Sequence, residues 1–90
     1  MNYARRKRIK NMILSIQEIR GLIDHMNSEI EDIAEDERAS IDSMPESLQD
    51  TDKSAKMEEA IESLESAYEP IETISSSLDE LEEALEVAMV

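Results

Sequence analysis

The chain has 90 residues, no cysteine, one glycine, two prolines and two aromatic residues, and its formal net charge is −14 at pH 7. This length allows one small domain, and the lack of cysteine excludes a disulfide framework and thiolate metal sites. An apolar fraction of 40% is too high for a disordered acidic tail, whereas a charged fraction of 36% fits a long-helix or coiled-coil protein.

The start of the chain resembles a signal peptide only in its charge. Its basic residues are followed by Gln17, Glu18 and Arg20, which interrupt what would be the apolar region of such a peptide. No apolar stretch approaches the ~18 residues that a membrane span needs. We therefore expect a cytoplasmic protein with no membrane span.

Charge is distributed unevenly along the chain. Residues 1–21 carry six basic side chains and one acidic side chain, whereas residues 22–90 carry three basic and 22 acidic side chains. Five of the basic residues form what we call the basic arm: Arg5, Arg6, Lys7, Arg8 and Lys10. The acidic remainder favours a protein partner with a basic surface and disfavours nucleic acid.

A first helix is predicted over about residues 3–41. Its apolar residues return every three or four positions, at Ile9, Met12, Ile16, Ile19, Ile23, Met26, Ile30 and Ile33. This is the repeat of a coiled-coil seam, in which Ile9 and the residues seven apart from it take position a, and Met12 and its equivalents take position d. The seam weakens at Glu37, which falls at a, so the helix is expected to end soon afterwards.

The connection between the helices is predicted at about residues 42–52. Ser43 and Glu46 have the spacing of a capping box, which predicts a short helical turn there. We expect Leu48 to cover the end of the helix pair and either Thr51 or Asp52 to cap the helix that follows.

A second helix is predicted over about residues 53–87, with the same repeat. Position a holds Met57, Leu64, Ile71, Leu78 and Leu85, and position d holds Ala60, Ala67, Ile74, Leu81 and Ala88. Pro70 lies in the interior of this helix, where it removes one backbone donor and crowds the preceding turn. A kink near Pro70 in an otherwise continuous helix is therefore expected.

Two such helices joined by about ten residues must run antiparallel. The sequence thus predicts an all-α fold, a long coiled-coil-like helical hairpin that forms a single domain over residues 1–90. Further apolar residues indicate a second contact face, an oligomer seam formed by Ile13, Leu22, Ile41, Ile61 and Tyr68. Pairing of two hairpins through these residues predicts a homodimeric four-helix bundle.

The second helix also carries a stripe of carboxylates, which we call the acidic rail. It consists of Glu58, Glu62, Glu65, Glu69, Glu72, Asp79 and Glu83. Its charges recur about every 4.5–6 Å along the helix, a spacing comparable with that of DNA phosphates. The rail is either a solvated face that keeps a small helical protein in solution or a surface that binds a protein partner by imitating DNA.

No set of residues points to catalysis, a cofactor or a metal. His25, the only histidine, falls on the solvent side of the first helix. The sequence after Asp50 begins like a calcium loop, but Ala55 and Ile61 stand where that loop needs glycine and a bidentate glutamate. We expect a protein that is not an enzyme and binds no cofactor.

The turn from Met44 to Gln49 and the segment from Met57 to Glu65 carry a resemblance to known proteins. They resemble small acidic helical proteins of bacteriophages and mobile elements of Gram-positive bacteria, which have a Leu-Pro-Glu-Ser-Leu-Gln-like turn followed by a glutamate-rich helix. Here Met44 replaces the leucine of that turn. The resemblance implies a phage or mobile-element setting in a bacterial host cell and, by analogy, an inhibitor of host defence or of a nucleic-acid-binding protein.

Three hypotheses about function follow from the sequence. In the first, the chain is an acidic protein-binding module that acts by charge mimicry. In the second, it is a structural or assembly protein whose oligomer is the functional unit. In the third, it is a small DNA-binding regulator whose basic arm grips phosphates, although the arm is equally interpreted as being neutralised by the acidic end of the second helix.

Overall fold

A computed structural model describes residues 1–90 and confirms the all-α helical hairpin. Its elements are α1 (Tyr3–Asp42), α2 (Glu46–Gln49), α3 (Asp52–Glu65) and α4 (Tyr68–Ala88). The first of these has the predicted extent, and α2 is the short helical turn expected in the connection. The single second helix expected from the sequence is divided into α3 and α4.

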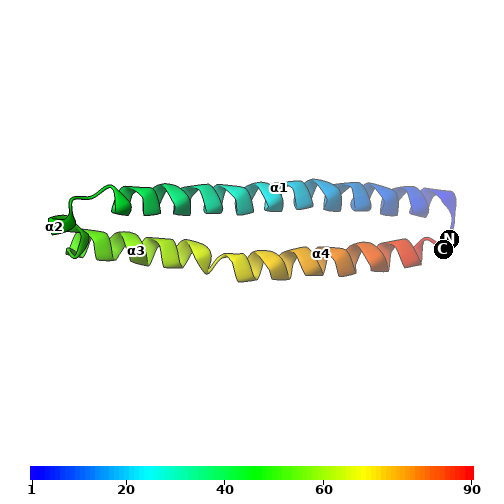
Figure 1. Cartoon of the computed structure of the whole chain (residues 1–90). Helices are drawn as coiled ribbons and strands as arrows, with labels where there is room; N and C mark the ends of the chain where they lie inside the picture. Colours follow the sequence, from blue (N-terminus) through cyan, green and yellow to red (C-terminus); the bar gives the residue numbers. More distant parts are fainter. The chain divides into compact units, whose positions relative to one another are not determined.

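The contacts of the chain group into two compact units. Unit 1 combines Met1–His25 with Ile71–Val90, and unit 2 is Met26–Pro70. In unit 1 the first part of α1 runs antiparallel beside α4, so that both chain ends lie at the same end of this unit (Figure 1). In unit 2 the last part of α1 leads through α2 into α3, which runs back beside it (Figure 1).

The start of α1 is fixed by an N-cap at Asn2, which the apolar repeat does not reveal. The side-chain oxygen of Asn2 accepts a hydrogen bond from the backbone N–H of Arg5 at 2.8 Å. Asparagine is among the best residues for this position, because its oxygen satisfies one of the four N–H groups that have no partner inside a helix. The basic arm is therefore held in a regular helix from its first residue.

The predicted capping box at the connection is wrong. The hydroxyl of Ser43 donates to the carbonyl of Ala39 at 2.7 Å, so it closes the end of α1 and does not cap α2. Pro45 occupies the N-cap position of α2, without a side-chain hydrogen bond. A proline there fixes the backbone angle φ without losing a helical hydrogen bond, which explains why the short helix forms in the absence of the box.

Ser54 closes the turn where we expected Leu48. Leu48 is 48% exposed, whereas Ser54 is only 2% exposed. The hydroxyl of Ser54 lies 2.9 Å from the carbonyl oxygen of Thr51 and also contacts that of Gln49. The carbonyl at the end of α2 needs a partner that an apolar side chain cannot supply. Thr51, one of the two residues predicted to cap the second helix, is the N-cap of α3, but its hydroxyl donates back to the carbonyl of Leu48.

The second predicted helix is interrupted at Ser66 and Ala67, and is not merely kinked. Pro70 has no N–H to donate to the carbonyl of Ser66. The N–H of Ala67 turns instead to the carbonyl of Leu64, three residues back, at 3.1 Å. Because of this break, Pro70 becomes the third residue of α4. In the first turn of a helix a missing N–H costs no hydrogen bond.

The hairpin packs through positions a and e of the repeat, where the sequence predicted a and d. On α1 the buried and half-buried residues are Ile9, Ile13, Ile16, Arg20, Ile23, Asn27, Ile30, Ala34, Glu37 and Ile41. On α3 and α4 they include Met57, Ile61, Leu64, Tyr68, Ile71, Ser75, Leu78, Glu82 and Leu85. These two sets, which we call the a–e seam, alternate steps of three and four without interruption.

The prediction that the d residues lie in this seam is wrong. Met12, Ile19, Met26 and Ile33 of α1 are 42–53% exposed, and Ile74 and Leu81 of α4 are equally open. We call these six residues the d column. The helices on both sides of the hairpin have apolar residues at positions a and d and several at position e. A single neighbouring helix can cover only two of these three columns.

The core of the hairpin is thin. Only five apolar residues are buried, namely Ile9, Ile16, Ala34, Ile61 and Leu78, and no large side chain is completely enclosed. A chain of this size has little apolar area to bury, and many such chains complete their core by association. The exposed d column leaves further apolar surface uncovered in the hairpin.

The break before α4 leads to a first prediction. Pro70→Ala restores the N–H that can donate to Ser66, so we expect higher helicity by circular dichroism and an increase of up to about 1 kcal/mol in the free energy of unfolding. Pro45→Ala is the matched control, because Pro45 precedes a helix and its replacement gains no hydrogen bond. Lower helicity in Pro70→Ala than in the unchanged chain would contradict this account of the break.

Candidate interaction surfaces

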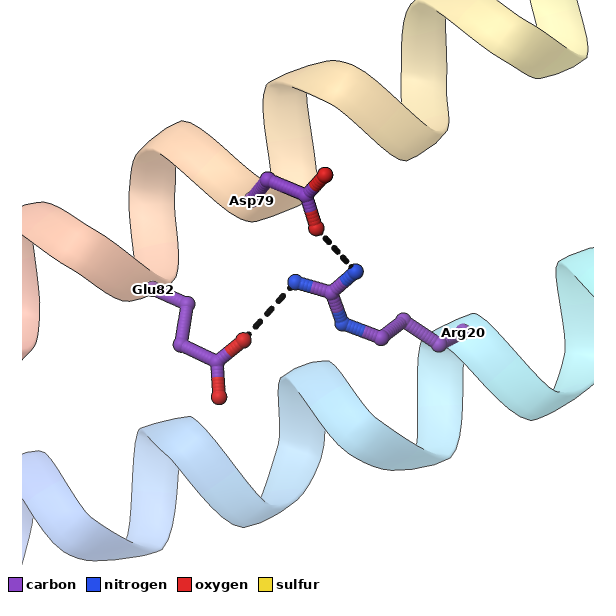
Figure 2. A network of polar contacts seen from close by, with 3 residues as sticks. All are labelled: Arg20, Asp79 and Glu82. Atoms are coloured by element: carbon purple, nitrogen blue, oxygen red, sulfur yellow. Dashed lines mark hydrogen bonds and ion pairs between the residues drawn. The ribbon is translucent and has the colours of Figure 1, made fainter.

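An arginine in the seam of unit 1 joins α1 to α4. Arg20 reaches from α1 between two carboxylates of α4, one turn apart, and uses a different guanidinium nitrogen for each (Figure 2). Its Nη2 atom lies 2.8 Å from Oε2 of Glu82, and its Nη1 atom pairs with Oδ1 of Asp79. The planar fork of arginine suits such a double contact, which fixes the register of the two helices.

The two carboxylates also act on the ionisation of Arg20. The hydrogen bond that Arg20 donates to Asp79 is the main reason why the pKa of Arg20 lies above its ordinary value, with Glu82 adding to it and partial desolvation opposing it. A raised pKa means that the arginine contributes stability at every pH below its unfolded-state pKa, and that this contribution is lost only as the pH rises through the folded value. The positive charge in the seam is therefore permanent at physiological pH.

The seven carboxylates of the acidic rail are divided between the two units, and two of them form ion pairs with arginines of α1. Asp79 pairs with Arg20 in unit 1, and Glu65 pairs with Arg38 in unit 2. The remaining rail residues are all exposed: Glu58, Glu62, Glu69, Glu72 and Glu83. The rail is thus partly a means of holding the hairpin together and partly an open acidic surface.

Unit 2 has a hollow that three rail carboxylates share. Glu58, Glu62 and Glu65 line it from α3, and Arg38 and Asp42 line it from α1. The hollow is open to solvent, has a volume of about 350 Å³ and has apolar walls formed by Ile41 and Ile61. We call it the acidic groove.

The negative charge of the chain is concentrated in the same unit. Unit 2 holds 15 acidic and three basic side chains, whereas unit 1 holds eight acidic and six basic side chains. The formal charges are therefore −12 and −2, which together give the −14 of the chain. A basic molecule approaching the chain is attracted mainly by unit 2.

The basic arm has no ion pair in the structure. Its five residues are exposed along the first turns of α1, and the ion pairs of the chain are those of Arg20 and Arg38. Lys10 and Glu86 line a common hollow at the end of unit 1 but do not form a salt bridge. The interpretation that α4 neutralises the arm is therefore not supported, and the positive charges of the arm face solvent.

Four of the five residues predicted to form an oligomer seam are used within the hairpin. Ile13, Ile41, Ile61 and Tyr68 all lie in the a–e seam, and only Leu22 is exposed, at 60%. One signal in the sequence favours this arrangement. Arg20 and Glu82 both occupy position e, where folding back of the chain brings opposite charges together.

The remaining surface offers no arrangement for metal binding. His25 is exposed, and the chain contains no group of three or more His, Asp or Glu side chains placed to hold a metal ion. None of the helices combines the length and the apolar character needed to cross a bilayer.

The fold and these surfaces define an acidic helical hairpin with three distinct faces: the acidic groove with its rail, the basic arm and the d column. Comparison with models of protein families, with curated proteins and with solved structures finds no match to this chain. The resemblance to helical proteins of bacteriophages and mobile elements therefore stays a prediction.

The Arg20 cluster leads to a second prediction. Arg20→Met leaves Glu82, which is only 22% exposed, without its partner in the seam. Arg38→Met removes a pair whose side chains are 50% and 41% exposed, and such pairs contribute about 0–1 kcal/mol. We expect Arg20→Met to lower the urea midpoint of unfolding at least about twice as much as Arg38→Met, because desolvated charges depend more on their partners. Equal losses would mean that the seam pair is as dispensable as a surface pair.

Proposed function

We propose that this chain is a non-enzymatic, acidic protein-binding module that acts in the bacterial cytoplasm on a partner with a basic surface. The acidic groove of unit 2 is the observation that carries this proposal. It combines four carboxylates, from Asp42, Glu58, Glu62 and Glu65, and the guanidinium of Arg38 with apolar walls from Ile41 and Ile61.

This combination suits the side chain of a lysine or arginine. Such side chains lay their methylene groups on apolar surface and keep the charged end in a polar environment. In the groove the methylene groups would contact Ile41 and Ile61 while the charge meets Glu58 and Glu62, which have no ion pair within the chain. Charge-assisted hydrogen bonds of this kind are about twice as strong as neutral ones.

The charge of unit 2 supports the same function at longer range. A formal charge of −12 on 45 residues attracts a basic partner before contact and raises the association rate, an effect that falls as salt is added. The resemblance stated above adds a setting to this proposal, in which a phage or mobile-element protein inhibits a host defence or nucleic-acid-binding protein by imitating DNA. The exposed rail residues supply the charges for that imitation.

A second candidate function is assembly, in which an oligomer of the hairpin is the functional unit. The exposed d column favours it, because its six large apolar side chains remain 42–53% exposed in the hairpin. The homodimeric four-helix bundle expected from the sequence belongs to this candidate. In this case the acidic rail serves only to keep the assembly in solution.

The third prediction tests the acidic groove. The doubly substituted chain Glu58→Lys/Glu62→Lys is expected to bind the partner, captured from a bacterial lysate and identified by mass spectrometry, at least about tenfold more weakly, because it places two positive charges where the partner's positive charge docks. Titration with the purified partner measures the loss. Asp32→Lys/Glu35→Lys makes the same change of charge on the exposed side of α1 and is expected to cost much less. Equal effects of the two variants would show that only total charge matters and would refute the groove.

The unpaired basic arm allows a DNA-binding regulator as a third candidate, and the fourth prediction addresses it. The net charge of −14 opposes DNA, so we expect no shift of a short DNA duplex in a gel at low salt. Binding that weakens steeply with salt and disappears when Arg5, Arg6 and Lys7 are replaced by alanine would establish the regulator in place of the acidic module.

A further inference from the structure

We propose that a second copy of this chain covers the d column of unit 1 together with Leu22 beside it, and that this face, which shares only Leu22 with the oligomer seam expected from the sequence, is the dimer interface. The inference rests on the second candidate function and gives it a partner and a surface. It does not depend on the acidic groove. The residues that carry it are Met12, Ile19 and Leu22 of α1 and Ile74 and Leu81 of α4.

The charged residues that α1 and α4 bring together in unit 1 mark one side of its helix pair. Arg20 pairs with Asp79, and Lys10 shares a hollow with Glu86. Asp79 and Glu86 are seven residues apart, so they lie in one column along α4. This column and Lys10 flank the a–e seam on the same side.

The d column flanks the seam on the opposite side. Lys10 of α1 and Asp79 and Glu86 of α4 all occupy position b of the repeat. On each helix, positions b and d lie on opposite sides of the a–e seam. Because the helices are antiparallel, the two d columns turn to the same side of unit 1. Ile19 and Leu81, which are 42% and 49% exposed, therefore belong to one continuous apolar face.

This face is also free of acidic residues, although α4 carries seven carboxylates. The d column of α4 and its outer neighbour contain only Ile74, Ser77, Leu81, Ala84 and Ala88. The corresponding columns of α1 in unit 1 contain no acidic residue either, and they hold Met1, Arg5, Arg8, Met12, Ser15, Ile19 and Leu22. Two chains that each carry a charge of −14 can approach closely through this face without opposing carboxylates against carboxylates.

Two further observations select a second copy as the occupant. Five side chains that are each 42–60% exposed give an apolar patch on the order of a few hundred Å², comparable to the largest patch that a monomeric protein commonly leaves open and a substantial part of the about 800 Å² that each partner buries in a standard interface. A helix that packs on this patch needs side chains repeating every 3.5 residues, and the d columns of α1 and α4 have that repeat themselves. The face is therefore complementary to itself.

Sedimentation equilibrium of the full chain tests the proposal. We expect a dimer in the unchanged chain, and we expect Ile19→Glu and Leu81→Glu each to raise the dimer dissociation constant at least about 100-fold, because each would bury a carboxylate in an apolar contact. Both positions are half-exposed in the hairpin, and circular dichroism checks that helicity is unchanged. Ile19→Ala/Leu81→Ala weakens the dimer without adding charge and serves if a glutamate variant unfolds.

Leu14 provides a matched control, because it is also a large apolar residue, 56% exposed, but lies in the hollow with Lys10 and Glu86 on the other side of unit 1. Leu14→Glu is expected to leave the dissociation constant within about threefold of the unchanged value. Salt gives an independent readout. Raising it from about 0.05 to 0.5 M should tighten an apolar dimer of like-charged chains, whereas contact between the basic arm and an acidic surface would loosen.

A monomer at about 100 μM, or dissociation by Leu14→Glu as complete as by Ile19→Glu, would overturn the proposal. The groove variant Glu58→Lys/Glu62→Lys separates this outcome from the fate of the acidic module. Loss of partner binding in that variant with the dimer intact supports both proposals. A monomeric chain whose partner binding still requires Glu58 and Glu62 refutes only the dimer.

Discussion

Both sides of the hairpin carry apolar residues at positions a, d and e of the repeat, but a single neighbouring helix can cover only two of these three columns. Most of the remaining structure depends on this geometric limit. The hairpin uses positions a and e, where Arg20 meets Glu82 and where Ala34 allows close packing. The side chains at position d, among them Met12 and Leu81, remain about half exposed to solvent. The hairpin is thus held by its backbone hydrogen bonds and ion pairs, while its apolar contacts are incomplete, a condition that association commonly relieves.

The polar residues inside the seam make the choice of columns intelligible. Arg20 binds two carboxylates of α4, which fixes the pairing in unit 1, and beside the seam Arg38 binds Glu65 in unit 2. A seam made only of a and d residues would be more apolar but would carry no such marker of register. The observed pairing through positions a and e buries less apolar surface within the chain than pairing through a and d would. It contains charged residues that specify one alignment of the two helices.

Charge and apolar surface are separated on this molecule. In unit 2 the carboxylates of the acidic groove line it together with two isoleucines, and this is the site that we propose for a basic side chain of a partner. In unit 1 the d column lies on the side opposite the pair between Arg20 and Asp79, and its surroundings contain no acid. One chain can therefore associate with itself through one surface and present its carboxylates to a different molecule through another.

The sequence by itself determined the all-α hairpin, the extent of α1 and the short turn at α2, because a 3.5-residue repeat and a proline act locally and leave few alternatives. It did not determine which columns pair, since a, d and e are all apolar in part and differ only in what the opposing helix offers. That choice, with the exposure of Ile19 and the burial of Ile61, came from contacts between residues far apart in the chain. The same holds for the acidic groove, whose walls come from α1 and α3, and for the break at Ser66, where the loss of one hydrogen bond ended the helix instead of bending it.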